Sequence, residues 1–96
     1  MTTKQRAYLR SLAMTIDPVT QIGKDGITEA FLSGVDAAIE KRELIKISVL
    51  QTSPIFAKEA SVEIAEALDA TVVQVIGSRI ILYRKNRKKP KIVLPK

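Results

Sequence analysis

Residues 21–32, QIGKDGITEAFL, place two glycines three positions apart at a junction between two kinds of predicted structure. The apolar segment 19–22 before the glycines predicts a short strand. From residue 27 to about residue 42, apolar side chains recur at three- and four-residue spacing, which predicts a helix. Each glycine costs conformational entropy, so the pair indicates either a turn with unusual backbone angles or a close approach of another molecule to the main chain.

The flanking segments predict a helix before this junction and a strand after it. Apolar spacing over residues 3–14 predicts a helix, and Asp17-Pro18 ends it because the residue before a proline avoids helical angles. Residues 44–50 alternate apolar and polar side chains. This alternation predicts a half-buried strand with Lys46 on its polar face.

Ser53-Pro54 predicts the start of a third helix, over residues 54–69, with serine as the N-cap and proline in the first turn. The outer side of this helix carries four acidic side chains: Glu59, Glu63, Glu66 and Asp69. An anionic partner would avoid these charges, so we expect this side to face away from a nucleic-acid-binding surface.

Two β-branched runs, 71–76 and 80–84, predict a hairpin around the turn Gly77-Ser78-Arg79. The predicted order is then α-β-α-β-α-β-β. Strands joined by helices predict parallel neighbours with right-handed crossovers, and the hairpin adds an antiparallel pair. We therefore expect an α/β fold, a four-stranded mixed sheet packed with helices.

The composition restricts the chemistry that this chain can perform. A length of 96 residues with 46% apolar residues fits one domain with a modest core. There is no Cys and no His, which removes disulfides, thiolate nucleophiles, the common zinc ligands and the usual proton-transfer side chain. We expect no enzymatic activity, no cofactor and no metal. No segment approaches the roughly 20 apolar residues of a membrane span, and the N-terminus lacks a signal-peptide core, so we expect a cytoplasmic protein.

The net charge of +6 is concentrated at the two ends of the chain. Ten of the 16 basic residues lie there, three in 1–16 and seven in 84–96, and neither end contains an acid. The middle of the chain holds all 10 acidic residues. This segregation favours a polyanionic partner. Pro90 and Pro95 disfavour regular structure, so we expect residues 86–96 to be a basic, flexible tail.

The spacing of the glycine pair matches one phosphate-binding pattern and not others. A Walker loop needs four residues between its glycines, and the dinucleotide fingerprint needs three glycines. What remains is G-x-x-G between a strand and a helix, the pattern with which KH-type proteins clamp a nucleic-acid backbone. The free N–H groups at the start of the next helix favour an anion there. The candidate residues are Gly23, Lys24, Asp25 and Gly26, although an ordinary tight turn has the same spacing.

Basic side chains elsewhere extend the candidate RNA-binding surface: Lys4, Arg6, Arg10, Lys46, Arg79, Arg84, Lys85, Arg87, Lys88 and Lys89. For Lys46 and Arg79, a solvated position without a ligand is an equally good interpretation. The chain has only four aromatic residues, and no stacking platform of the RRM kind is evident. Binding should therefore depend on phosphates and shape more than on stacked bases.

Four sequence blocks, in order and at fitting intervals, resemble one protein family: KQRAYLRSLA (4–13), PVTQIGKDG (18–26), ELIK (43–46) and VQVIGSRIILYR (73–84). They are similar to the YhbY-like proteins, the small bacterial members of the CRM-domain family, named for chloroplast RNA splicing and ribosome maturation. The resemblance covers residues 3–84, nearly the whole chain.

This resemblance implies a fold similar to the C-terminal domain of translation initiation factor 3. It also implies a single CRM-type RNA-binding domain, here residues 1–85, with a KH-like GxxG loop at 23–26. Bacterial members of the family associate with precursors of the large ribosomal subunit, so the expected partner is large-subunit ribosomal RNA or a pre-ribosomal particle. We expect a monomer with no membrane partner.

Three alternatives remain open at this point. A DNA-binding or nucleoid protein would share the basic charge, and duplex preference at matched salt would reveal it. A protein-interaction module would use the polar strand face or the acidic helix 54–69. An enzyme acting through carboxylates such as Asp25 or Asp36 would need a facing acid pair in a cleft, which the spacing does not predict.

Overall fold

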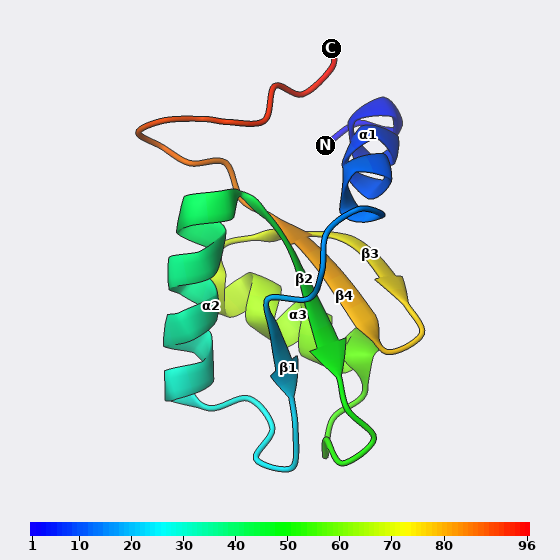
Figure 1. The fold of residues 1–96 in the computed structure, drawn as a ribbon, viewed down its shortest axis with the longest axis vertical. Helices are drawn as coiled ribbons and strands as arrows, with labels where there is room; N and C mark the ends of the chain where they lie inside the picture. Colours follow the sequence, from blue (N-terminus) through cyan, green and yellow to red (C-terminus); the bar gives the residue numbers. More distant parts are fainter.

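Four strands form one mixed sheet in the order β1-β2-β4-β3 (Figure 1). The computed structural model describes all 96 residues. The elements are α1 (Thr3–Ala13), β1 (Thr20–Ile22), α2 (Glu29–Arg42), β2 (Leu44–Val49), α3 (Ala57–Leu68), β3 (Thr71–Ile76) and β4 (Arg79–Tyr83). β1 runs parallel to β2, while β4 is antiparallel to both β2 and β3. The predicted element order and the four-stranded mixed sheet are confirmed.

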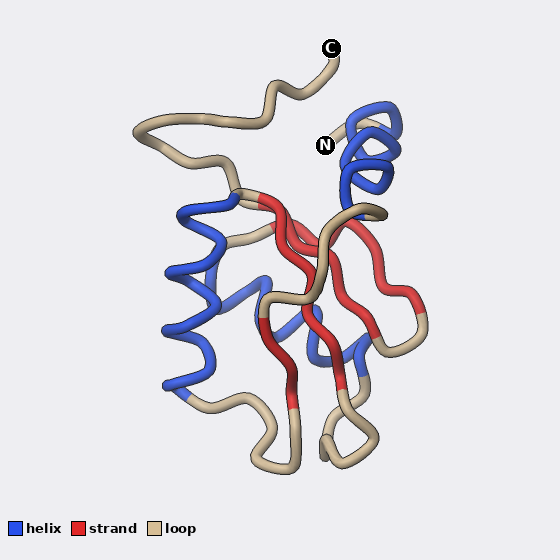
Figure 2. The backbone as a smooth tube through the Cα atoms, in the orientation of Figure 1, coloured by secondary structure: helices blue, strands red, loops and turns tan.

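Helices cover both faces of the sheet, and the alternation of β2 decides which side chains meet which helix (Figure 2). Ile45, Ile47 and Val49 are buried in one core cluster with side chains of α2 and α3. Leu44 is buried in a second cluster, together with Leu9 and Ala13 of α1. Because neighbouring strand residues point to opposite faces, Lys46 and Ser48 share the α1 face with Leu44.

The third helix begins later than the sequence pattern predicts. It starts at Ala57 rather than at residue 54, and its N-cap, Phe56, makes no side-chain capping bond. The prediction that Ser53 caps this helix is wrong. Ser53 Oγ instead accepts a hydrogen bond from the Ile55 amide at 3.1 Å and donates one to the Ile55 carbonyl at 2.8 Å. Serine favours such local bonds as readily as helix caps, so the pattern located the turn and not the helix.

Smaller differences affect two other boundaries. The second helix begins at Glu29, and the Thr28 side chain caps it by accepting from the Phe31 amide at 3.0 Å. Arg79 is the first residue of β4 and not part of the hairpin turn. The turn is the two-residue loop Gly77-Ser78, with a φ of 56° at the glycine. A left-handed residue at the first position of a two-residue loop suits the twist of a hairpin.

The C-terminal segment has no regular secondary structure, but its main chain is attached to the domain. Glu43 is fully buried between α2 and β2, and its carboxylate accepts hydrogen bonds from the amides of Asn86, Lys91 and Ile92. Ile92 and Leu94 also pack against the α1 core cluster. The segment therefore runs back over the end of the sheet, above α2 in Figure 1.

Candidate nucleic-acid interface

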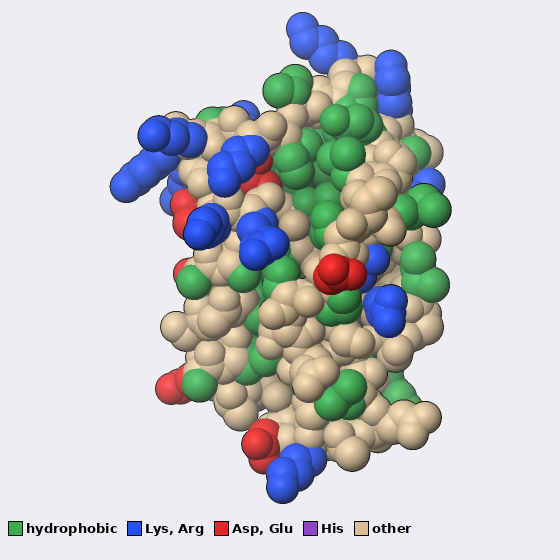
Figure 3. Space-filling view, in the orientation of Figure 1, with side chains coloured by type: hydrophobic (Ala, Val, Ile, Leu, Met, Phe, Trp, Pro, Cys, Tyr) green, Lys and Arg blue, Asp and Glu red, His purple; other side chains and the backbone are tan.

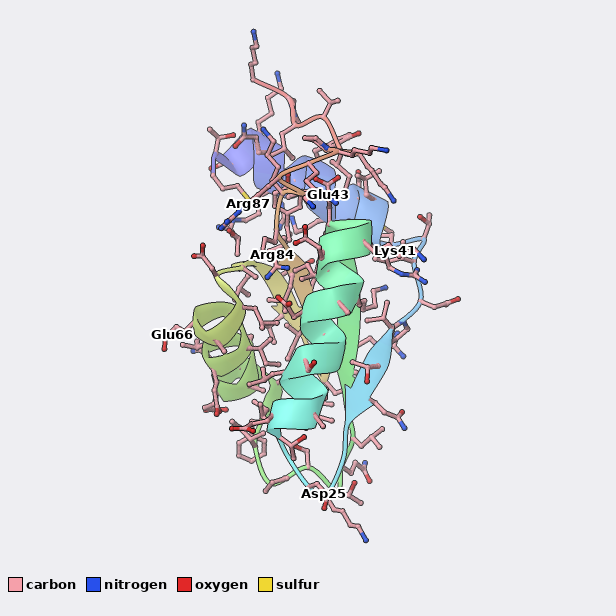
Figure 4. The ribbon with its side chains drawn as sticks, turned by 90° about the vertical axis from the view of Figure 1, so that its left-hand side faces the viewer. Asp25, Lys41, Glu43, Glu66, Arg84 and Arg87 are labelled. Atoms are coloured by element: carbon pink, nitrogen blue, oxygen red, sulfur yellow. The ribbon has the colours of Figure 1, made fainter.

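The glycine pair forms a four-residue turn between β1 and α2. The Gly26 amide donates to the Gly23 carbonyl at 3.0 Å, which closes the turn. Gly26 has a φ of 68°, and a Cβ there would lie 3.2 Å from Pro54 Cγ. Left-handed backbone angles and crowding both require glycine at this position. Lys24 and Asp25 occupy the two central positions and are exposed, and Asp25 lies at the tip of the molecule in Figure 4.

Gly23 differs from Gly26 because the fold does not require it. A Cβ on Gly23 would meet Leu50 Cδ1 and Thr52 Oγ1 at 3.9 Å, which is an ordinary contact distance. Its backbone angles also lie outside the left-handed region. The glycine turn, residues 23–26, is thus held by Gly26 and presents Lys24 to solvent, while Gly23 has no structural role that explains it.

The start of α2 offers fewer free donors to an anion than the sequence suggests. The Phe31 amide is already bound by Thr28 Oγ1, and Glu29 adds a negative charge in the first turn. Asp25 does not cap the helix. At this turn, Lys24 and the exposed main chain therefore attract phosphate more strongly than the helix dipole does.

Three predicted RNA-binding side chains meet on the α1 face of the sheet. Arg10 of α1, Lys46 of β2 and Arg79 of β4 line one concavity of about 180 Å³. We call these three residues the sheet basic cluster. The floor and rim consist of Ala13, Met14, Gln74, Ile76 and Ile81, and no acidic residue lines the site. Three cations around a hollow without a carboxylate make a favourable site for phosphate groups.

Strand pairing explains why this cluster forms. Lys46 lies opposite Ile81, and Ser48 lies opposite Arg79, so Lys46 and Arg79 project from neighbouring strands on one face. Arg10 reaches the same hollow from α1, which crosses this face of the sheet. Lys46 is 36 positions from Arg10 and 33 from Arg79 in the sequence, so the three residues meet only in the folded chain. RNA contact by Lys46 and Arg79 stays a prediction.

A second group of cations lies where the end of α2 meets the C-terminal segment. The C-terminal basic patch comprises residues from α2 and the final segment: Lys41, Arg42, Lys88, Lys89 and Lys91. Figure 3 shows basic side chains gathered at the upper left of the view, and Figure 4 places Lys41 and Arg87 in the upper half. Lys41 and Arg42 were not among the sequence candidates, because the helix dipole accounts for cations at a helix C-terminus. Asp36 and Glu40 also line this region, and their negative charges weaken the positive electrostatic potential of the patch.

Two predicted RNA-binding arginines hold the fold together. Arg6 Nη1 donates to the carbonyls of Val72 and Val73 at 2.6 and 2.9 Å, where a register shift interrupts the pairing of β3 with β4. Arg84 donates to Asp36 Oδ1 at 2.7 Å, to Glu40 Oε2 at 3.0 Å and to the Leu68 carbonyl at 2.8 Å. Both guanidinium groups thus have protein partners, and RNA contact by either remains a prediction. Lys4 and Lys85 are exposed.

Glu43 has the most perturbed environment among the acids. Burial raises its pKa, but the hydrogen bonds from three main-chain amides and the charge of Lys91 outweigh burial and hold the pKa below its ordinary value. The carboxylate therefore stays ionised and anchors the C-terminal segment. Burial and the negative charge of Glu43 raise the pKa of neighbouring Tyr83.

Two further features concern other functional classes, metal-binding proteins and membrane proteins. No group of three or more Asp, Glu, His or Cys side chains is arranged to hold a metal ion. None of the helices has the length and apolarity needed to cross a membrane.

Comparison with known proteins gives the family of this small α/β domain with clustered cations. Residues 1–84 match the model of the CRS1 / YhbY (CRM) domain, and the chain belongs to this family. It is 38% identical to "Probable RNA-binding protein YqeI" of Bacillus subtilis, over 99% of both chains. It is 33% identical to a protein of Haemophilus influenzae named "RNA-binding protein", over 100% of this chain and 96% of the relative.

A solved structure confirms the fold. The solution structure of the hypothetical protein SAV1595 from Staphylococcus aureus superposes with a TM-score of 0.82. The two chains are 47% identical, and the match covers 99% of each. The family resemblance seen in the four sequence blocks is therefore confirmed.

Proposed function

We propose that this protein is a non-enzymatic, cytoplasmic RNA-binding protein that takes part in assembly of the large ribosomal subunit. One observation carries the RNA-binding proposal: the convergence of Arg10, Lys46 and Arg79 on a hollow that no acidic residue lines. The names of the Bacillus subtilis and Haemophilus influenzae relatives support RNA as the partner. The ribosomal role rests on the family resemblance.

The binding mechanism follows from the two cationic features. The sheet basic cluster neutralises phosphates of the RNA backbone, and the shape of the hollow fixes the register of the chain on the RNA. At the glycine turn, Lys24 contacts a further phosphate, and Gly23 lets the sugar-phosphate chain approach the protein backbone. The acidic side of α3 lies on the face opposite the sheet basic cluster, as nucleic-acid binding requires.

Two triple variants with the same net charge test the mechanism. One carries Arg10→Ala, Lys46→Ala and Arg79→Ala, and the matched control carries Lys85→Ala, Lys88→Ala and Lys89→Ala. Binding to a large-subunit ribosomal RNA fragment is measured across a salt series, because the slope of log affinity against log salt counts the phosphate contacts. We expect the first variant to lose more than about tenfold in affinity and to reduce the slope by about 2. Equal losses in both variants would mean that the sheet basic cluster contributes no more to binding than the cations of the C-terminal segment.

Two further measurements separate this function from its alternatives. An excess of duplex DNA should not displace the RNA at matched salt, whereas a nucleoid protein would prefer the duplex. In cells without this protein, sucrose-gradient profiles should show precursors of the large subunit accumulating. A normal profile would contradict the ribosomal role and leave RNA binding intact.

A further inference from the structure

An apolar groove lies at the end of the molecule that carries the glycine turn. It has a volume of about 560 Å³ and runs between the segment after β2 and the β3–β4 hairpin. Its lining comprises Val49, Leu50, Gln51, Ser53, Ile55, Phe56, Ala57, Lys58, Val75, Gly77 and Ser78. Binding pockets for small ligands have volumes of about 300–1,000 Å³, so the groove has room for a nucleobase with its sugar.

Phe56 is the unusual residue of this groove. Its exposure is 82%, although a phenylalanine normally contributes to the core. Phe31, the other phenylalanine, packs against the core cluster as expected. Leu50 beside Phe56 is also exposed, at 37%. An aromatic ring next to an open groove is positioned for contact with another flat, apolar group.

The groove adjoins the glycine turn. A Cβ on Gly26 would lie 3.2 Å from Pro54 Cγ, so the turn packs directly against the segment that leads to Phe56. The Leu50 amide donates to the Ile22 carbonyl at 2.9 Å and holds that segment beside β1. A strand of RNA that crosses the glycine turn therefore reaches the groove within the same end of the molecule, the lower end of Figure 1.

The groove combines an apolar lining with one positive charge, which suits a base together with its phosphate. Lys58 is the only charged residue in the lining. It lies in the first turn of α3, whose N-terminus has no side-chain cap. The free amides there add positive potential, which Glu59 in the same turn partly offsets. The hairpin tip links this groove to the sheet basic cluster, because Ile76 lines the cluster and its neighbours Val75 and Gly77 line the groove.

We propose that the groove binds an unpaired base of single-stranded RNA, stacked on Phe56, with its phosphate beside Lys58. This inference rests on the proposed RNA-binding function and adds a base-contacting site to it. From the sequence, we expect binding to depend on phosphates and shape more than on stacked bases. The exposure of Phe56, which the sequence did not reveal, adds one stacking position to that expectation. The protein should then prefer single-stranded or looped RNA to a fully paired helix, whose bases cannot reach the ring.

Substitutions at Phe56 test the stacking directly. Phe56→Leu keeps an apolar side chain but removes the aromatic face, whereas Phe56→Tyr keeps the face. Binding to a single-stranded ten-nucleotide RNA should weaken about tenfold for Phe56→Leu and stay near wild type for Phe56→Tyr. Tyr8→Leu, at the other aromatic exposed by 38%, is the matched control and should change affinity less than about twofold.

A second measurement uses the absence of tryptophan in the chain. In Phe56→Trp, the single indole should lose fluorescence when the single-stranded RNA binds. A series of oligonucleotides, each with one abasic site, should contain one that fails to quench. That oligonucleotide should also bind wild type and Phe56→Leu with nearly equal affinity. Without the base, the ring has no stacking partner, so removing the ring should cost no further affinity.

Each outcome decides the proposal. Loss of affinity in Phe56→Leu with quenching in Phe56→Trp supports base stacking. Unchanged RNA affinity in Phe56→Leu overturns it, and the groove would then belong to an apolar protein partner. If wild type itself fails to bind both the oligonucleotide and the ribosomal RNA fragment, the proposed function fails, and that failure is distinct from the failure of the groove alone.

Discussion

At the scale of single residues, the two positions of the turn are occupied by glycine for different reasons. Gly26 has left-handed backbone angles and a proline against the position of its missing Cβ, whereas Gly23 has ordinary angles and space for a methyl group. Glycine at 26 thus serves the fold. Nothing in the structure requires glycine at 23, and this makes Gly23→Ala a variant that reports on function.

The first prediction compares these two glycines. Gly26→Ala should lower the free energy of unfolding by about 1–2 kcal/mol, because a non-glycine residue resists left-handed angles. Gly23→Ala should change it by less than about 0.5 kcal/mol. Urea denaturation followed by circular dichroism measures both. If Gly23→Ala unfolds at the lower urea concentration of the two, the structural assignment of the turn is wrong.

The second prediction concerns Glu43, whose pKa is lowered in the folded state. A group with a lowered folded pKa stabilises the protein above its unfolded pKa, and this stabilisation is lost as pH falls through the folded pKa. Glu43→Gln should therefore cost about 2–3 kcal/mol at neutral pH, because a buried charged hydrogen-bond acceptor is lost. The difference from wild type should shrink as the pH falls below the ordinary value of 4.5. A difference that stays constant with pH would show that the carboxylate charge does not hold the C-terminal segment.

At the scale of elements, α2 contains a glycine that nothing in its surroundings requires. Gly34 lies in the middle of the helix, is exposed, and has no atom within 4 Å of the position of a Cβ. Gly34→Ala should raise the free energy of unfolding by about 0.5–1 kcal/mol. Thermal and urea unfolding would show the gain. RNA affinity should not change, and a loss of affinity would place this face of α2 in the interface.

A second element-scale feature is the attachment of α1 to the sheet. Arg6 donates two hydrogen bonds to carbonyls at the irregular pairing of β3, so part of its charge serves structure and not RNA. Arg6→Ala should destabilise the fold by about 1–3 kcal/mol. Because the Arg6 guanidinium already has protein partners, its loss should not remove a phosphate contact. The salt slope separates these effects, because it should remain unchanged after Arg6→Ala when binding is compared below the unfolding transition.

At the scale of the whole molecule, the glycine turn and the C-terminal basic patch lie at opposite ends of the long axis (Figures 1 and 3). The molecule measures 39 × 27 × 22 Å, so one RNA must span most of 39 Å to contact both. At roughly 3.4 Å per stacked nucleotide, this is about 11 nucleotides. Affinity should rise steeply with oligonucleotide length up to this size and then level off. A plateau at four or five nucleotides would show that one end alone binds.

Local sequence patterns were sufficient to locate the helices and strands, but they did not predict where some of these elements begin. Three- and four-residue spacing located the helices, and alternation located β2, because those periods reflect burial on one face. Ser53 misplaced the start of α3 because a serine hydroxyl satisfies a local turn as well as a helix cap. Of the candidate site, the sequence named Arg10, Lys46 and Arg79 singly. Their meeting depends on the pairing of β2 with β4 and on the placement of α1, which no local pattern contains.

The amino-acid sequence by itself determined the element order, the mixed sheet, the segregation of charge and the family, because these follow from short-range periodicity and composition. Only the tertiary structure decided which cations have protein partners. It bound Arg6 and Arg84 to protein partners, joined three other cations in one hollow, and left Phe56 exposed beside the glycine turn. The physical reason is that a side chain's partners lie tens of residues away in the chain, so its role is settled by packing and not by its neighbours in sequence.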